Sequence, residues 1–199
     1  MQRTECFPRL QAMHALRASA TAFAILLTAC GPAQEAPTPV ATESTPCVPG
    51  GQGFLRARLR GAIEADLDWQ DGDMHCEGGL RPDGSGLRLA IVGPLKGSGR
   101  MLRLVFGIDT GSPEGHEAHA ATNLTLIVEG AQRLYATLGD DKCTSDSLQR
   151  SDIGTGSGAR QRVEVRGFCT GPAATMDGSD RVLVERFDFT TSYSTGSPP

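Results

Sequence analysis

Apolar and polar residues alternate with a period of two over much of the chain after residue 53, and Gly, Asp and Pro gather at the breaks. This pattern is typical of antiparallel strands that bury one face and expose the other. We therefore expect an all-β fold, either an antiparallel β-sandwich or a partly open barrel. After the first two segments, the predicted strands are Gly86–Val92, Arg100–Asp109, Asn123–Glu129, Arg133–Leu138, Cys143–Leu148, Gln161–Thr170 and Arg181–Thr191.

The first alternating segment is Phe54–Trp69, with apolar residues at odd positions and charged residues at most even ones. The parity continues through Gly61, so two interpretations fit. The segment is either one long strand bent at the glycine or a hairpin that pairs Arg58 with Asp66. We prefer the bent strand, because a glycine inside a strand often marks a bulge or bend.

The Asp71-Gly72 dipeptide predicts a two-residue type I′ turn leading into the next strand. Antiparallel pairing around that turn places Leu67 opposite Cys76 on the apolar side. On the outer side it places Asp68 opposite His75, where a surface ion pair contributes at most about 1 kcal/mol.

Three segments allow other interpretations. Gly115–Thr122 and Ala131–Leu138 are each also compatible with a short helix. Gly154–Gly158 is rich in glycine, but it lies between strands and lacks the helix start and the lysine of a phosphate-binding loop. We interpret it as a connecting loop.

Four cysteines lie in the predicted domain: Cys47, Cys76, Cys143 and Cys169. An even number of cysteines in an exported chain predicts disulfides, and three connectivities are open. We favour Cys47–Cys76 with Cys143–Cys169, because the intervals are similar and neither bridge has to cross the domain. A four-cysteine zinc site is disfavoured, since the chain has no Cys-x-x-Cys pair there.

The first 29 residues have the features of a secretory signal peptide. Arg3, Arg9 and Arg17 give a positive start, and the apolar core Ala18–Ala29 ends in small residues. The core is too short for a membrane span, which needs about 20 apolar residues. Met13 offers a second translation start that leaves the mature protein unchanged.

Leu27-Thr28-Ala29-Cys30 resembles the lipobox of bacterial lipoproteins. The resemblance covers the signal alone, and it implies cleavage before Cys30 and acylation of that residue. Each buried acyl methylene contributes about 0.8 kcal/mol, so two or more chains anchor a protein stably. The residue after Cys30 is Gly31. By family analogy, an aspartate at this position would favour retention at the inner membrane. The resemblance therefore implies attachment to the outer membrane, on its periplasmic face.

Residues 30–46 form a predicted tether, because Gly31–Pro46 holds four prolines and no aromatic residue and cannot build a core. At about 3.1 Å per residue in extended geometry, it reaches up to about 50 Å. Residues 47–193 are then expected to form a single all-β domain, and residues 194–199 a disordered tail.

Acidic residues outnumber basic ones in the mature chain. The full sequence has 19 Lys and Arg against 23 Asp and Glu, and removal of residues 1–29 leaves 16 against 22, a net charge of −6. This balance argues against nucleic acid as a partner. The membrane, through lipid on Cys30, and an envelope protein are the partners we expect.

The most suggestive catalytic fragment is Asp109-Thr110-Gly111. It resembles the Asp-Thr-Gly loop of aspartic proteases, in which two aspartates share a proton and activate water. The chain has one such loop, so this chemistry would require a homodimer. Turn formation after a strand explains the same residues.

Two patterns suggest metal binding weakly. His116-Glu117-Ala118-His119 spaces its histidines by three rather than the four of a helical zinc site. Asp66, Asp68, Gln70 and Glu77 have calcium-loop spacing, but Gly72 is misplaced for the required turn. We expect no metal and no cofactor.

We therefore expect a membrane-anchored periplasmic or envelope lipoprotein with a non-catalytic binding or structural role. The polar loops Asp109–Ala121 and Ser151–Gln161 are candidate contact regions. The enzyme alternative is a homodimeric aspartic-type hydrolase that uses Asp109. A chaperone or inhibitor is a third class, and an exposed apolar patch of several hundred Å² would indicate it.

Overall fold

The computed structural model describes residues 45–111, 119–154 and 159–195, and it is all-β, as predicted. No helix forms among these residues. The strands are β1 (Phe54–Gly61), β2 (Ala65–Gln70), β3 (His75–Leu80), β4 (Gly86–Leu95), β5 (Arg100–Asp109), β6 (Ala120–Val128), β7 (Arg133–Ala136), β8 (Cys143–Ile153), β9 (Arg160–Cys169), β10 (Ala173–Ala174) and β11 (Arg181–Ser194).

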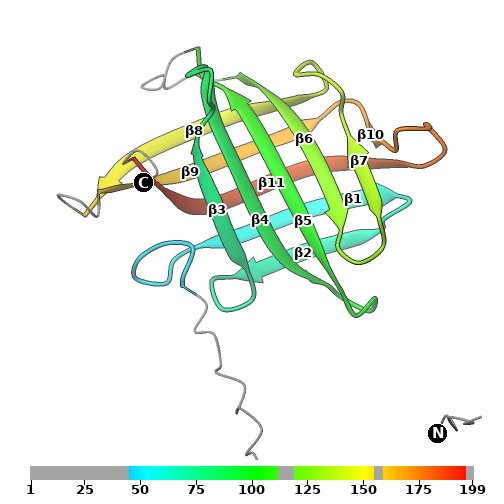
Figure 1. Cartoon of the computed structure of the whole chain (residues 1–199), viewed down its shortest axis with the longest axis horizontal. Coiled ribbons are helices and arrows are strands. Elements are labelled where there is room, and N and C mark those ends of the chain that lie inside the picture. Colours follow the sequence, from blue (N-terminus) through cyan, green and yellow to red (C-terminus); the bar gives the residue numbers. More distant parts are fainter. Residues whose placement is uncertain (1–44, 112–118, 155–158, 196–199) are drawn as a thin grey trace, which may run out of the picture. The chain divides into compact units, whose positions relative to one another are not determined.

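The strands form one antiparallel 11-stranded sheet that folds back on itself into two layers. One layer holds β2, β1, β11, β9 and β8, and the other holds β3, β4, β5, β6 and β7. Figure 1 shows the second layer crossing in front of the first. Two corners join the layers: β6 pairs with the start of β8, and the short β10 pairs with both β7 and β11. Strands β2 and β3 each pair with one neighbour and form the two ends of the sheet.

The core lies between the layers and contains the inward side chain of every second strand residue. Phe106 on β5 contacts Phe187 and Phe189 on β11, with ring centroids 5.1 and 4.6 Å apart. Aromatic pairs at these distances add about 0.5–1.5 kcal/mol each beyond the area that they bury. Trp69 and Tyr135 are also fully buried. The aromatic cluster thus joins the two layers.

Segment Phe54–Trp69 is a hairpin, so the bent-strand prediction is wrong. Strand β1 pairs with β2, and Arg58 lies opposite Asp66, as in the alternative interpretation. Gly61 has a φ of 109°, and a Cβ there would lie 2.5 Å from the carbonyl oxygen of Arg181. Ala62 donates its N–H to that same carbonyl at 2.9 Å. Contact with β11 therefore ends β1 at the glycine, and opposite charges across the hairpin favour the pairing.

The predicted pairing across Asp71-Gly72 is also wrong. The turn is tight, because Asp73 donates its N–H to the carbonyl of Gln70 at 2.8 Å. However, Gly72 is not among the residues with positive φ, so the turn is not type I′. Strand β3 pairs with β4 instead of β2, so neither Leu67 and Cys76 nor Asp68 and His75 are partners. The turn carries the chain from one layer to the other.

The other predicted strands are confirmed, with shifted ends. Arg100–Asp109 has the predicted bounds, whereas β8 and β11 run further, to Ile153 and Ser194. Within Ala131–Leu138 the chain forms β7 and no helix. The residues of Gly115–Thr122 from Ala120 onward belong to β6, and residues 112–118 lie outside the described residues.

Both disulfides join the cysteines that the sequence favoured. Cys47 is bonded to Cys76 with their Cα atoms 5.2 Å apart, and Cys143 to Cys169 with theirs 3.9 Å apart. The second pair lies directly opposite in the register of β8 and β9. The first joins the start of the described chain to β3. Together they fasten the beginning of the fold and one of its corners.

Candidate binding surface

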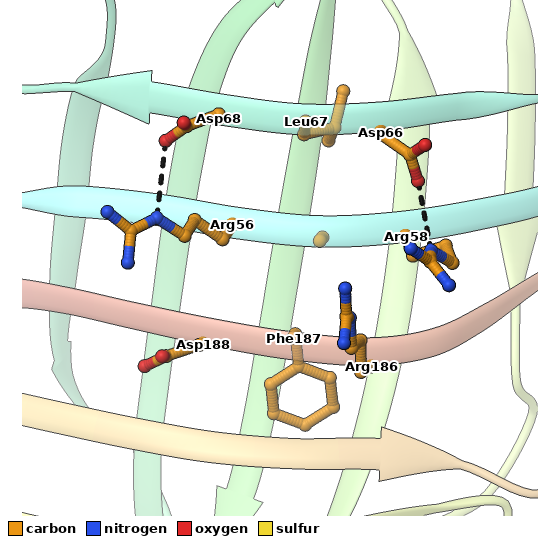
Figure 2. Close-up of a pocket in the computed structure, with 9 residues that line it drawn as sticks. Arg56, Arg58, Asp66, Leu67, Asp68, Arg186, Phe187 and Asp188 are labelled. Carbon is orange, nitrogen blue, oxygen red and sulfur yellow. Dashed lines mark hydrogen bonds and ion pairs between the residues drawn. The ribbon is translucent and has the colours of Figure 1, made fainter.

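The outer face of β2, β1, β11 and β9 carries alternating charges. Across these four strands, Asp68 lies opposite Arg56, Arg56 opposite Asp188, and Asp188 opposite Arg166. The ion pairs on this face include Arg56–Asp68 at 3.4 Å, Arg58–Asp66 at 3.1 Å and Arg166–Asp188 at 3.6 Å. Figure 2 shows Arg56 turned toward Asp68 and Arg58 toward Asp66 across β1 and β2. We call this surface the charged face.

A shallow groove of about 510 Å³ runs over the charged face. Its lining includes three arginines and three aspartates: Arg56, Arg58, Arg186, Asp66, Asp68 and Asp188. Desolvation raises the pKa of Asp66, but the charges and hydrogen bonds of Arg60 and Arg58 together outweigh it and leave that pKa below its ordinary value. The positive and negative side chains that line the groove therefore largely balance one another.

The outer face of β4, β5, β6 and β7 is different, because it carries an apolar patch beside the ion pairs of Arg103 with Glu77 and Glu129. Ala90 lies opposite Val105, and Ile127 lies opposite Leu134. These residues face away from the core, which takes the alternate positions such as Phe106. An outward face of an antiparallel sheet is usually polar. Here Leu134 is 38% exposed, so an apolar side chain meets solvent. We call this surface the apolar face.

A groove of about 400 Å³ crosses the apolar face. Its lining residues are Arg81, Pro82, Arg88, Val105, Gly107, Asn123, Thr125, Ile127 and Leu134. The volume is within the range of small-molecule sites. Small residues help to hollow it, since Arg88 has Gly79 on one side and Gly107 on the other in the sheet register.

Asn123 fixes one wall of this groove. Its side chain occupies the space above Gly107, where a Cβ would collide with the amide. The amide nitrogen donates to Asp140 at 2.6 Å. A side chain at position 107 would displace Asn123, so the glycine is required for the shape of the groove.

Leu138 lies just beyond this wall in an unusual conformation. Thr137 continues the β6–β7 register by donating its N–H to the carbonyl of Leu124 at 3.0 Å. The next residue, Leu138, has a φ of 53° and is 68% exposed. Positive φ in a leucine costs about 1–3 kcal/mol, and such strain gathers at functional sites. A strained and exposed apolar residue thus lies near the rim of the apolar face.

Asp109 stands at the end of β5 and stabilises a turn. Its Oδ1 accepts the N–H of Gly111 at 2.9 Å, and Thr110 is buried and donates its N–H to the carbonyl of Ser85. Gly111 has a φ of 63°, which favours glycine. The Asp109-Thr110-Gly111 fragment therefore has the geometry of the turn interpretation.

The structure separates the residues of the calcium-like pattern. Asp66 and Asp68 pair with arginines of β1, whereas Glu77 lies on β3 and contacts Arg103 at 3.4 Å. Of the His116 and His119 pattern, only His119 is described. Among the described residues, no group of three His, Cys, Asp or Glu side chains is placed to hold a metal ion.

The predicted acylation site Cys30, the predicted signal 1–29 and most of the predicted tether 30–46 lie outside the described residues, as do residues 155–158 and 196–199. Parts of both candidate contact loops do so too. None of the residues that the structure describes belongs to a helix long and apolar enough to cross a membrane.

Sequence reasoning missed the apolar face, although a signal was present. The strict alternation breaks at Ala90-Ile91-Val92 and at Leu126-Ile127-Val128, where consecutive residues are apolar. Such runs indicate that both faces of the strand are apolar.

Searches against protein family models, curated proteins and solved structures found no match to this chain.

Proposed function

We propose that this protein is a lipid-anchored envelope protein with a non-catalytic binding role, held at the periplasmic face of the outer membrane through Cys30. The lipobox and the proline-rich tether support the anchor. The two disulfides are consistent with an oxidising compartment outside the cytoplasm. The apolar face is the proposed binding surface.

The contrast between the two outer faces carries the binding proposal. The charged face pairs its arginines and aspartates with one another and stays solvated. The apolar face presents Val105, Ile127 and Leu134 around a groove instead. Small-molecule sites are concave and lined by apolar side chains with a few polar groups, and this groove has that composition.

The attachment of Cys47 supports a tethered domain. This residue stands where the predicted tether ends, and three contacts hold it. Its sulfur is bonded to Cys76, its N–H donates to Asp71 at 2.7 Å, and its carbonyl accepts the hydroxyl of Ser192 at 2.7 Å. A pull on the tether is therefore transmitted to β3, to the turn after β2 and to β11.

Site-specific photo-crosslinking in intact cells tests the binding surface. A photoreactive phenylalanine derivative replaces Leu134 on the apolar face in one strain and Arg186 on the charged face in another. Both positions are exposed, so neither replacement should disturb folding. We expect a discrete adduct from position 134 and none from position 186.

Equal adducts from both positions, or none from position 134, would contradict the assignment of the binding surface. A Cys30→Ser variant provides a separate control for the anchor. The variant should be absent from the pelleted membrane fraction, whereas the protein that carries lipid should be found in it.

A further inference from the structure

We infer that the groove of the apolar face binds a single-chain anionic amphiphile, with its carboxylate at Arg81 and Arg88 and its chain along Val105, Ile127 and Leu134. This inference rests on the proposed binding function and adds the chemical class of the ligand. It follows from the separation of charge and apolar surface within one groove.

Arg81 supplies a buried donor at one end of the groove. Its Nη1 atom is buried and has no hydrogen-bond partner, and its Nη2 atom lies 3.7 Å from Asp83. A buried guanidinium nitrogen without a partner carries an unpaid desolvation cost. The Asp83 carboxylate itself accepts the N–H and the hydroxyl of Ser85, at 3.0 and 2.8 Å. If the guanidinium turned toward the groove, an anion there would complete the hydrogen bonding of Arg81.

Arg88 adds an exposed positive charge beside it. It forms no ion pair among the described residues, and its register neighbours Gly79 and Gly107 have no side chains to cover it. The acids around the groove are engaged. Asp83 lies 3.7 Å from Arg81, and Glu77 and Glu129 pair with Arg103 at 3.4 and 3.1 Å. Asp140 accepts the amide of Asn123 at 2.6 Å, and Asp109 accepts the N–H of Gly111. The lining itself carries two positive charges and no negative one.

The apolar end has the direction and length to hold an alkyl chain. From Arg88 on β4 the groove crosses Val105 on β5 and Ile127 on β6 to reach Leu134 on β7. Strands lie about 4.8 Å apart and rise about 3.3 Å per residue, so this diagonal spans about 20 Å. That length suits a long acyl chain lying flat on the sheet.

The groove of the charged face is a weaker candidate. It contains as many aspartates as arginines, so a ligand of either sign would have to displace an existing ion pair. In the groove of the apolar face, Arg81 is paired with Asp83 at 3.7 Å, whereas Arg88 forms no ion pair among the described residues and is open to an anion.

The test uses the full chain, purified from membranes into nanodiscs of zwitterionic phosphatidylcholine. Its probe is a long-chain fatty acid that carries a photoreactive diazirine, and the matched probe is the methyl ester of the same acid. Mass spectrometry locates the labelled peptides as probe concentration rises. The variants are Arg88→Gln, Leu134→Ser and the matched control Arg186→Gln, all at exposed positions.

We expect saturable labelling of peptides from β4 to β7 by the acid, and half-saturation at an about tenfold higher concentration for the ester. Arg88→Gln should weaken labelling by the acid by a similar factor, Leu134→Ser should weaken labelling by both probes, and Arg186→Gln should change neither. Equal affinity for acid and ester, no effect of Arg88→Gln, or labelling spread over both faces would overturn the inference.

The two proposals can fail separately. A photo-crosslink from position 134 to a protein, together with no saturable labelling by the fatty acid, would leave the binding surface in place and reject the amphiphile. Loss of both signals would reject both proposals.

Discussion

The carboxylate of Asp71 accepts the backbone N–H of Cys47 at 2.7 Å, although 24 positions separate the two residues in the sequence. Its second oxygen accepts the N–H of Gly53 at 2.6 Å. One side chain in the turn between the layers thus holds both ends of the segment that leads into β1. The same segment is joined to β3 by the disulfide of Cys47.

Asp71→Asn should destabilise the fold by about 1.5–3 kcal/mol, because one of two hydrogen bonds to a charged acceptor is lost. Asp73→Asn is the matched control in the same turn. Asp73 makes an exposed contact of 3.3 Å with the N–H of Gln70, so its replacement should cost less than about 0.5 kcal/mol. Urea unfolding measures both. Equal effects of the two variants would show that Asp71 has no special role.

Removal of the first disulfide should lower the free energy of unfolding by about 3–4 kcal/mol in the chain-entropy account. The bridge closes a loop with a sequence separation of 29. A Cys47→Ser, Cys76→Ser double variant and the oxidised parent are compared by urea unfolding, with and without reductant. Reductant should shift the parent strongly and the variant less, because the variant keeps only Cys143–Cys169. If the variant and the parent unfold at the same urea concentration, the bridge does not stabilise the fold.

Gly93→Ala should destabilise the core by about 1–3 kcal/mol through overpacking. A Cβ at this position would collide with the indole ring of Trp69, whose Nε1 donates to the carbonyl of Pro94 at 3.0 Å. The emission of Trp69, the one tryptophan of the chain, should shift to longer wavelength as the ring moves. Gly79→Ala is the control, since its Cβ would meet nothing within 4 Å. Unchanged emission and stability in Gly93→Ala would contradict this packing.

Asp177 should titrate far below an ordinary aspartate. The Thr175 hydroxyl, followed by the N–H and hydroxyl of Ser179, lowers its pKa from 3.8 to about 2. Because the folded pKa is depressed, the stabilisation is complete above about pH 4 and is lost as pH falls through about 2. Carboxyl NMR titration should show the pKa of Asp177 rising toward 3.8 in Thr175→Val. It should rise less in Ser179→Ala, which keeps the N–H donor. No change in Thr175→Val would rule out this cause.

Most of the strands could be predicted because alternation depends only on local sequence. On β5, Leu102, Leu104, Phe106 and Ile108 all face the core, and the strand has the predicted bounds. The same parity could not distinguish a bent strand from a hairpin in Phe54–Trp69, because both keep the apolar residues on one side. Contact between Gly61 and Arg181, 120 positions later in the numbering, decides it.

The path after β2 also depends on long-range contacts. The turn residues alone favour a hairpin, whereas Asp71 binds Cys47 and Trp69 packs on Gly93 of β4. The apolar face is a similar case. Its apolar runs are visible in the sequence, but only the register of β4 to β7 shows that Val105, Ile127 and Leu134 lie around one groove.

Mass spectrometry of the N-terminal peptide of the protein isolated from membranes tests the lipid-anchored assignment most directly. We expect a mature chain that begins at Cys30, with the added mass of acyl chains on that residue. Recovery of an uncleaved chain with an unmodified Cys30 would contradict the anchor and, with it, the placement of the domain at the membrane.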